Sequence, residues 1–405
     1  MSILYLKYLQ EADECQQLHN VTGTIWDALS HDGKMFRQHF GIPYNMFHSI
    51  NHNWTTHGEF RRPVNVTGQE RTDSRILLLG CFRLISKGVT FDAIEELSNV
   101  SVAHFHVFFK KFIDWFFKFY FKDWIVFPST IDEVQHVESR YASRGLPGCI
   151  GSIDCVHIGW DMCPAGFQAD CHGKEGFLTL AFEAIVSYTR RIMSVTPSFF
   201  GAWNDKTIVK FDESVTKLRK ESFYTDYTWE VMDSEGRQCP QKGLYLICDG
   251  GYHRWQTLMP PYKHQIEGSA EGKWSKHVES LRKDVECTFG ILKKHYAILK
   301  NCLHLHSKEH IEDIFRVCCV LHNMNHDFDG YDKVEFVDVA ARIGTTMPEE
   351  HAMVGYDDSV DEGGCLHERE LFRNRQDLLI AHFQYYRAKG VDFYQDKANK
   401  MPNIT

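Results

Sequence analysis

The stretch "LYLICDGGY", from Leu244 to Tyr252, runs five apolar residues into an aspartate and two glycines. An apolar run of this length, bounded by turn residues, predicts a strand inside a sheet. Asp249 would then stand at the carboxyl end of that strand, where sites form in open α/β sheets. A second predicted strand, "GSIDCVH", carries Asp154. Two strands that each carry a carboxylate predict a site at this edge of the sheet.

A third carboxylate, Glu286, lies on a long helix predicted from about Ser275 to Lys300. At about 100° per residue, the apolar residues of this helix form one narrow stripe. The stripe, predicted to be buried, consists of Val278, Leu281, Val285, Phe289, Leu292, Tyr296 and Leu299. An adjoining face carries Arg282, Glu286, Gly290 and Lys293. Cations and a bare backbone suit a phosphodiester chain, and Glu286 could reach the two strand ends if the helix crosses the sheet.

Three carboxylates in one pocket would raise each other's proton affinity unless cations occupy the site. Oxygen-only ligands favour Mg²⁺ or Mn²⁺, and two such ions about 4 Å apart support phosphoryl transfer. Each carboxylate also has a purely structural interpretation. Asp154 and Asp249 could cap turns, and Glu286 could pair with Arg282 one helical turn earlier. Because the trio occurs on strand, strand and helix in that order, the metal site is the preferred interpretation.

The order of elements around these residues predicts an α/β fold. Residues from Lys34 to about Lys122 have helical patterning, and Gly145, Pro147 and Gly148 mark a change of character. Three strand-like segments follow, "GCIGSIDCVHI", "GFLTLAFEAIVSY" and "RRIMSVTPSFFG". Next come a helix with Asn204 as its predicted N-cap, the fourth strand to Cys248, and further helices, including 308–325 and 368–389. This order is expected of an RNase H-like mixed sheet flanked by helices.

The helical region contains the outline of a helix-turn-helix. Phe91 to Leu97 predicts a short helix, Ser98-Asn99 a turn, and Ser101 the N-cap of a longer helix. That second helix would present four basic side chains to DNA, His104, His106, Lys110 and Lys111. The alternative is an ordinary helical hairpin packed on its aromatic residues.

The chain has 405 residues, of which 43% are hydrophobic, and a formal charge of −9. The region from Asp327 to Glu362 holds eleven Asp or Glu against Lys333 and Arg342, so the rest of the chain is neutral overall. The N-terminal part from Lys34 to Ile125 is mildly basic. No secretory signal or membrane span is recognised, and scattered cysteines fit buried thiols in a reducing compartment. We therefore expect an intracellular protein without a membrane segment.

Three further groups of residues have competing interpretations. The group of Cys155, His157, Cys163, Cys171 and His172 could suggest zinc, but its spacing matches no common zinc knuckle. Lys273, Lys276 and His277 could hold phosphates or lie in a solvated loop. Trp203, Trp255 and Trp274 could stack on bases, although packing is the more common role.

The motifs "GSIDCVH", "YLICDGGYHRW" and "LRKDVECTFGILKKHYAIL" resemble those of PIF/Harbinger transposases and the nucleases derived from them. The resemblance covers most of the chain, from near Lys34 to Phe328, and Asp249 and Glu286 are 37 positions apart, close to the spacing in that family. It implies an RNase H-like DDE catalytic domain with Asp154, Asp249 and Glu286 as the metal-binding triad. It also nominates Asp205 as an accessory ligand, although "FFGAWND" departs from the usual lead-in with Pro-Gly-Ser.

The implied organisation is an N-terminal arm (1–33), a helical, helix-turn-helix-like DNA-binding domain (34–144), the DDE catalytic domain (145–328), an acidic linker (329–367) and a C-terminal helix and tail (368–405). The expected DNA contacts are Lys110, Lys111, Arg282, Lys283, Lys293 and Lys294. The implied partners are transposon terminal repeats, target DNA, a Myb/SANT-like protein that supplies DNA binding and nuclear entry, and further copies of the chain on DNA.

The sequence thus predicts a nuclear, metal-dependent endonuclease and strand transferase that stays in the cytoplasm without its partner. The rival hypothesis is a domesticated, non-catalytic descendant that binds chromatin proteins. A general RNase H-like nuclease without a role in transposition is the third.

Overall fold

A computed structural model describes residues 30–57, 73–262, 266, 268–301, 305–331 and 366–393. The chain divides into two compact units, each built from separated parts of the sequence. The first unit comprises residues 1–125, 157–180 and 289–329, and the second comprises 126–156, 181–288 and 330–405. Almost all of the predicted N-terminal arm and acidic linker lies outside the described residues.

Helices form most of the first unit, which confirms the predicted N-terminal helical region. They are α2 (His31–Phe40), α3 (Tyr44–His57), α4 (Ser74–Lys87), α5 (Phe91–Ser98), α6 (Val102–Trp124), α8 (Gln168–Cys171) and α13 (Lys308–Phe328), with short 3₁₀ turns η1 (Ala165–Phe167) and η3 (Ala297–Leu299). Gly88 ends α4 in the left-handed conformation, and Asn99 ends α5 in the same way. The Ser101 hydroxyl accepts the His104 amide, which confirms this residue as the N-cap of α6.

The core of the first unit is largely aromatic and lies along α6, which packs against α13. The buried face of α6 consists of Phe105, Phe108, Phe109, Phe112, Ile113, Phe116 and Tyr120. Near the end of α13, the Asn325 amide donates to the Gly41 carbonyl and the Tyr296 hydroxyl, both at 3.0 Å. Arg37 makes a two-pronged ion pair with Asp329, with both contacts at 2.7 Å.

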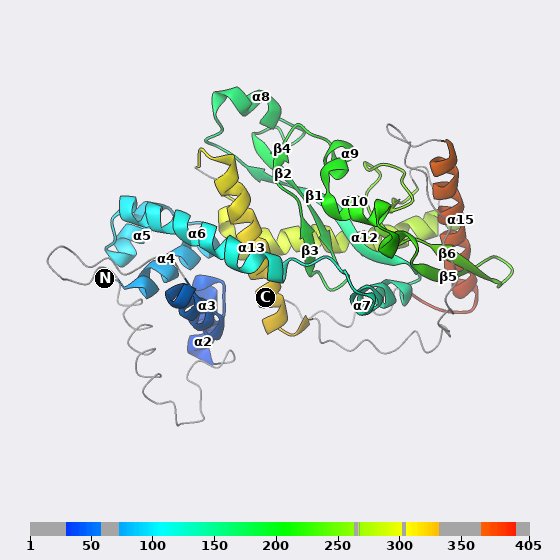
Figure 1. Cartoon of the computed structure of the whole chain (residues 1–405), viewed down its shortest axis with the longest axis horizontal. Helices are drawn as coiled ribbons and strands as arrows, with labels where there is room; N and C mark the ends of the chain where they lie inside the picture. The colour runs from blue at the N-terminus through cyan, green and yellow to red at the C-terminus, as the bar shows by residue number, and fades with distance from the viewer. Residues whose placement is uncertain are drawn as a thin grey trace. The chain divides into compact units, whose positions relative to one another are not determined.

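A six-stranded mixed sheet organises the second unit (Figure 1). Its strand order is β3 (Ile192–Val195), β2 (Thr179–Val186), β1 (Cys149–Gly159), β7 (Tyr245–Ile247) and β8 (Leu258–Met259), and β4 (Phe199–Phe200) also pairs with β2. β2 and β3 are antiparallel, whereas β1, β7 and β8 are parallel neighbours. The four predicted strand segments are therefore present and belong to one sheet.

Side chains alternate between the two faces of β7, and each face meets a separate core. Tyr245 and Ile247 pack with Trp274, Val278 and Leu281 of α12 (Ala270–His295). Leu244, Leu246 and Cys248 pack on the opposite side with Val209, Val215 and Leu218. Every residue of the predicted apolar stripe is buried, which confirms the orientation of α12. The helix itself starts earlier than predicted and ends at His295, before η3.

The other described elements of the second unit lie outside the six-stranded sheet. They are α7 (Ile131–Ala142), α9 (Asp205–Ile208), η2 (Val209–Phe211), α10 (Glu213–Lys220), α11 (Ser222–Thr225), a ribbon of β5 (Thr228–Met232) and β6 (Gln238–Lys242), and α15 (Leu366–Ala388). α15 packs beside the ribbon, where Arg375 donates to the Gln256 and Lys242 carbonyls and His382 Nδ1 accepts the Met232 amide at 2.9 Å. The single helix predicted after Asn204 is interrupted because Asp212 starts a new helix as the N-cap of α10.

Candidate active site

Parallel pairing brings the two predicted aspartates to matching positions on adjacent strands. Ser152 of β1 is in register with Ile247 of β7. Asp154 and Asp249 each lie two residues beyond this pair. Because alternate residues of a strand share a face, both carboxylates belong to the side of the sheet on which Ile247 contacts the α12 core. Asp249 follows the carboxyl end of β7, whereas Asp154 lies within β1.

Asp154 is largely buried, with 19% of its side chain exposed. Its Oδ1 accepts the Cys155 amide at 2.8 Å, and its Oδ2 lies 3.2 Å from Arg282 Nη1. Burial raises the pKa of this carboxyl to about 6, against the lowering effects of the Cys155 amide and Arg282. The charges of Asp249 and Asp205 add to the rise in pKa. Asp154 is thus electrostatically coupled to the other two aspartates of the site.

Asp249 and Asp205 flank the backbone of Gly251. Asp249 Oδ1 accepts the Gly251 amide at 2.7 Å, which closes the turn after β7. A Cβ added to Gly251 would lie 2.8 Å from Asp249 Oδ1 and 3.3 Å from Asp205 Oδ2. The missing side chain therefore leaves a small space edged by two carboxylates. Asp205 is the first residue of α9, whose N-cap Asn204 accepts the Thr207 amide at 2.9 Å.

Glu286 connects to Asp154 through Arg282. Arg282 Nη2 lies 2.6 Å from Glu286 Oε1, while Nη1 of the same guanidinium contacts Asp154. Arg282 is only 15% exposed, whereas Glu286 is 45% exposed. The predicted pairing of Glu286 with Arg282 one turn earlier therefore exists, and it is part of the site because the same guanidinium bridges strand and helix.

The donor atoms fit hard divalent cations, but the side chains are not arranged as a ligand set. The four carboxylates Asp154, Asp205, Asp249 and Glu286 offer only oxygen, which Mg²⁺ and Mn²⁺ prefer. Within the part of the chain that the structure describes, no group of three or more His, Cys, Asp or Glu side chains is placed to hold one ion. The positive charge among these carboxylates is the Arg282 guanidinium. Ligation by Asp154 and Glu286 together would require this guanidinium to move.

A buried acid pair lies beside the site. Glu183 on β2 is completely buried and is hydrogen-bonded to Asp212, which is 1% exposed and accepts the Ser214 and Val215 amides at 2.7 and 3.0 Å. Burial, followed by the charge of Asp212, raises the pKa of Glu183 well above its usual value. The Tyr252 hydroxyl bonds to Glu183 and lies 3.7 Å from Cys155 Sγ.

We infer from these contacts that Glu183 is the protonated partner and Asp212 the charged one, because Asp212 alone receives two backbone donors. The sequence prediction did not include either residue. The available signal was a single acid inside the otherwise apolar strand "TLAFEAIV".

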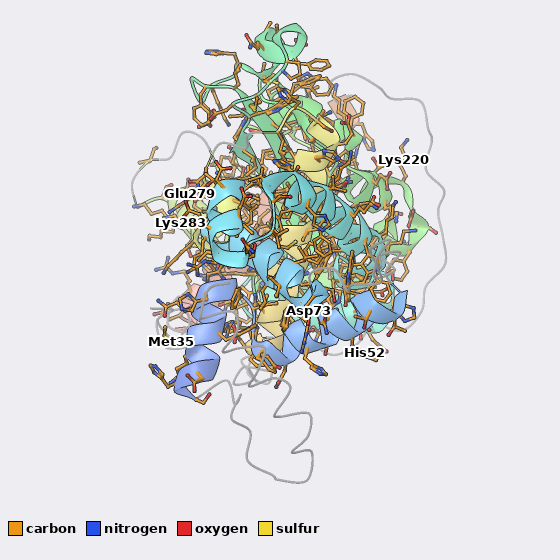
Figure 2. All side chains as sticks on the ribbon, turned by 90° about the vertical axis from the view of Figure 1, so that its left-hand side faces the viewer. Met35, His52, Asp73, Lys220, Glu279 and Lys283 are labelled. Atoms are coloured by element: carbon orange, nitrogen blue, oxygen red, sulfur yellow. The ribbon has the colours of Figure 1, made fainter. Side chains whose placement is uncertain are left out.

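The predicted DNA-contacting cations of α12 have different surroundings. Lys283 is exposed and lies one helical turn from exposed Glu279, both labelled in Figure 2. Lys294 is also exposed. Lys293 is partly buried and donates to the His157 carbonyl at 2.9 Å, and burial lowers its pKa. Lys293 is therefore tied to the backbone, whereas Lys283 and Lys294 face solvent.

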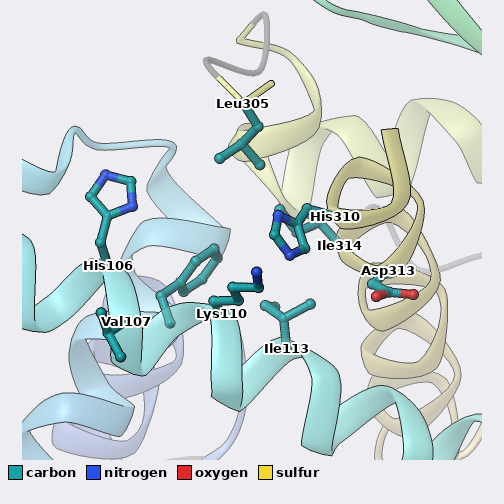
Figure 3. Close-up of a pocket in the computed structure, with 9 residues that line it drawn as sticks. His106, Val107, Lys110, Ile113, Leu305, His310, Asp313 and Ile314 are labelled. Carbon is teal, nitrogen blue, oxygen red and sulfur yellow. The ribbon is translucent and has the colours of Figure 1, made fainter. Parts of the chain in front are cut away.

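Lys110 and Lys111 of α6 are both exposed. Lys110 lines a cavity of about 240 Å³ between α6 and α13, together with His106, His310 and Asp313 (Figure 3). The ring of His106 stacks on Phe91 at 3.6 Å, so this residue supports the packing of α5 against α6. The role of Lys110 and Lys111 in DNA binding stays a prediction.

Several alternatives in the sequence are resolved by burial. His277 is 1% exposed and its Nε2 bonds to the Arg144 carbonyl at 2.6 Å, so it neither holds a phosphate nor lies in a solvated loop. The interpretation was wrong because α12 begins at Ala270 and includes this residue. Trp255 and Trp274 are buried, but Trp203 is 36% exposed. His157, one of the residues considered for zinc, bonds through Nδ1 to the Thr179 hydroxyl at 2.9 Å.

Comparison with known proteins identifies the family to which the chain belongs. A sequence profile of the family described as plant transposon protein matches residues 126–330, which is half of the chain. The chain belongs to this Harbinger transposase-derived family, as its motifs predicted. No solved structure matches the chain.

Individual relatives are distant. An ALP1-like protein of Arabidopsis thaliana is 23% identical over 211 residues, covering 50% of this chain and 48% of that protein. The Arabidopsis thaliana protein named Antagonist of Like Heterochromatin Protein 1 is 21% identical over 201 residues, 49% and 50% of the two chains. HARBI1 of Rattus norvegicus, whose name describes a candidate nuclease, is 24% identical over 265 residues, 64% and 66% of the two chains. The chain thus spans about half the length of the plant relatives it matches.

Among the described residues, no helix has the length and apolar character needed to cross a membrane.

Proposed function

We propose that the chain is a metal-dependent DNA endonuclease and strand transferase of the Harbinger type. Asp154, Asp249 and Glu286 are its catalytic carboxylates, and Asp205 is an accessory metal ligand. The observation that carries this proposal is the register of β1 and β7, which sets Asp154 and Asp249 at matching positions on neighbouring parallel strands. Glu286 is linked to Asp154 through Arg282.

The topology supports an RNase H-like catalytic fold. The strand order β3-β2-β1-β7-β8 places the carboxylate strands β1 and β7 side by side in the middle of the sheet. α12 packs on one face of this sheet and carries the third acidic residue. This strand, strand and helix arrangement is the one that the three sequence motifs implied.

Two Mg²⁺ or Mn²⁺ ions, when bound, would supply the Lewis acidity that activates water or a DNA 3′ hydroxyl and stabilises the leaving oxygen. Asp154, Asp249, Glu286 and Asp205 would hold the ions through their carboxylate oxygens. Gly251 leaves space between Asp249 and Asp205 because it has no side chain. Asp154 must be ionised to act as a ligand. Because its pKa is raised to about 6, DNA cleavage should fail as the pH drops below this range.

When Arg282 releases Glu286 and Asp154, its guanidinium is positioned to bind the scissile phosphate. Exposed Lys283 and Lys294 would contact neighbouring phosphates, and Lys110 and Lys111 would contact DNA from the helical unit. Lys293 would act less directly, because its ammonium holds the His157 carbonyl.

The substrates proposed for this activity are transposon terminal inverted repeats and target DNA. A Myb/SANT-like partner would supply additional DNA affinity and nuclear entry, and several copies of the chain would assemble on DNA. The family assignment and the lack of net positive charge on the chain outside residues 327–362 support this dependence on a partner. We place the working protein in the nucleus for the same reason.

A domesticated chromatin-binding scaffold is the second candidate. The observation that favours it is the Arg282 bridge, which occupies two of the catalytic carboxylates with a protein cation. The name of the Arabidopsis thaliana relative, which describes antagonism of a heterochromatin protein, is consistent with this alternative. A nuclease that cuts DNA without joining ends is a third candidate.

Cleavage and joining of labelled terminal-repeat DNA in Mg²⁺ or Mn²⁺ tests these candidates. Asp249→Asn should abolish cleavage and leave the melting temperature unchanged within a few degrees, because the substitution is nearly isosteric. Asp170→Asn, a change at an exposed aspartate of α8, is the control and should cut normally. Cleavage by Asp249→Asn at the normal rate would rule out the assignment. Cleavage without joining by the wild type would favour the third candidate, and absence of both activities would favour the scaffold.

A further inference from the structure

Three aromatic side chains form an exposed cluster next to Asp205. Phe199, Trp203 and Phe211 contact one another, with ring centroids 5.4 Å apart for Phe199 and Trp203, 5.8 Å for Trp203 and Phe211, and 5.9 Å for Phe199 and Phe211. Trp203 is 36% exposed and Phe211 is 56% exposed. We call these three residues the aromatic patch. Exposed groups of large apolar side chains commonly mark binding surfaces.

The backbone beneath the aromatic patch is held in place by hydrogen bonds. The Trp203 amide donates to the Phe200 carbonyl at 2.9 Å, which forms a tight turn after β4. Asn204 Oδ1 accepts both the amide and the hydroxyl of Thr207 at 2.9 Å. His253 Nε2 lies 2.9 Å from the Lys206 carbonyl. These bonds preorganise the patch, so ordering it on binding would cost little conformational entropy.

The segment supporting His253 is itself stacked and buried. The His253 ring stacks on Trp255 at 4.6 Å, and the Arg219 guanidinium covers Trp255 at 3.7 Å. Trp255 is 7% exposed, so its ring is part of the structure. Because Trp203 is exposed and Trp255 is buried, Trp203 is the ring available to a ligand.

Charge around the aromatic patch favours a nucleic acid. Residues 204–211 carry two exposed lysines, Lys206 and Lys210, and the acid among them is Asp205 of the candidate active site. Aromatic rings interleaved with cations are the usual means of binding single-stranded nucleic acid, since every base presents a π face and every nucleotide a phosphate. Asp205 follows Trp203 by two residues, so a strand whose phosphate reaches the carboxylates passes close to the patch.

We propose that the aromatic patch stacks on an unpaired nucleobase beside the phosphodiester to be cut. This proposal rests on the nuclease function proposed above, because that function brings the DNA strand to Asp205. Lys206 and Lys210 hold the phosphates on either side of the stacked base. The chain accordingly prefers DNA that is unpaired next to the cleavage position over a continuous duplex.

Binding of oligonucleotides that contain 2-aminopurine tests the proposal without requiring cleavage. The full-length protein is titrated, without divalent metal, into matched duplexes that either contain or lack one unpaired 2-aminopurine at the end of the terminal repeat. Stacking of the unpaired base on Trp203 should quench its fluorescence. Trp203→Ala should bind the unpaired substrate about tenfold more weakly, the effect expected for loss of one stacking ring, and should abolish the quenching.

Three control measurements make the result specific. Trp203→Phe should retain most of the affinity because a ring remains, and Phe211→Ala should weaken binding of the unpaired substrate. Phe177→Ala removes a similarly exposed aromatic residue from the first unit and should leave binding unchanged. Binding of the continuous duplex should change less than twofold in every variant, since phosphate contacts dominate it.

Equal affinity of Trp203→Ala and wild type for the unpaired substrate would overturn the proposal. Equal loss for both substrates would also overturn it, as it would indicate a general structural or electrostatic effect. A patch that fails to bind DNA but binds an apolar peptide would show a protein-docking surface instead. Because Asp249→Asn tests cleavage and Trp203→Ala tests metal-free stacking, failure of the nuclease function is distinguishable from failure of this proposal.

Discussion

Arg282→Gln should tighten the binding of Mn²⁺ at pH 8. The guanidinium lies 3.2 Å from Asp154 and 2.6 Å from Glu286, so any ion that binds both carboxylates must displace it. At such distances and an effective dielectric constant of about 20, each contact gives on the order of 5–6 kcal/mol of Coulomb attraction. Desolvation offsets most of this attraction, and Glu286 is 45% exposed, which weakens its share further.

A net competition of about 1–2 kcal/mol remains, which corresponds to roughly tenfold tighter Mn²⁺ binding in the variant. Calorimetry or electron paramagnetic resonance of Mn²⁺ at pH 8 measures this change directly. Lys283→Gln removes the same charge from an exposed position on the same helix and should change the affinity by less than twofold. If Arg282 also binds the scissile phosphate, DNA cleavage by the variant should fall while metal affinity rises.

The sign of the effect should depend on pH. Arg282 lowers the pKa of Asp154, which burial raises to about 6. Without the guanidinium this pKa rises further, so the variant should lose its advantage as the pH falls from 8 toward 6 because more Asp154 is protonated. Mn²⁺ binding by Arg282→Gln that is weaker than or equal to wild type at pH 8, in a folded protein, would show that the guanidinium does not compete with the ion.

Three other substitutions test the site and its support. Gly251→Ala should abolish Mn²⁺ binding with little loss of stability, because the new Cβ would lie 2.8 Å from Asp249 Oδ1. The control Gly290→Ala, on an exposed part of α12, should bind Mn²⁺ normally and stabilise the fold by about 0.5–1 kcal/mol. Normal Mn²⁺ binding by Gly251→Ala would refute the placement of these carboxylates. Glu138→Gln should stabilise the protein by roughly 3 kcal/mol at pH 8 and have no effect at pH 4. Burial raises the pKa of Glu138 to about 7, so its ionisation destabilises the fold as the pH rises from about 4.5 to 7. Denaturant unfolding at both pH values measures this, and destabilisation at pH 8 would contradict it. Glu183→Gln should preserve stability, because an amide can donate to Asp212 as the neutral acid does. Glu183→Ala should lower the melting temperature and the Mn²⁺ affinity together, because it leaves Asp212 buried without this donor. Equal behaviour of the two variants would show that Glu183 does not donate a proton to Asp212.

Local signals in the sequence predicted most of the elements of this fold. Ser101 and Asn204 occupy the cap positions expected of them, because caps depend on a few neighbouring residues. The apolar stripe of α12 is buried as its period predicted. The β5–β6 ribbon was missed because "TWEVM" and "QCPQK" are short and only partly apolar. The start of α12 was also missed, and the interpretation of His277 failed with it.

Features of the site that depend on distant parts of the chain were harder to predict. The motifs indicated Asp154, Asp249 and Glu286, but the bridge between Asp154 and Arg282 joins residues 128 positions apart. The pairing of Glu183 with Asp212 likewise depends on how β2 packs against the start of α10. No periodicity encodes such contacts, since each partner alone is compatible with a solvent-exposed or capping role. Burial, which sets the pKa of these groups, is a property of the assembled unit.

The interleaving of the two units limits how the protein can be dissected. The first unit takes residues 157–180 and 289–329 from within the region that also supplies the sheet and its acidic residues. A fragment ending near residue 125 would lack α13, whose side chains complete the aromatic core around α6. A fragment beginning near residue 126 would leave α13 without α6 and expose its apolar face to water. We expect neither half to be soluble alone, so a genetic truncation that separates the helical region from the sheet region should prevent both parts from folding.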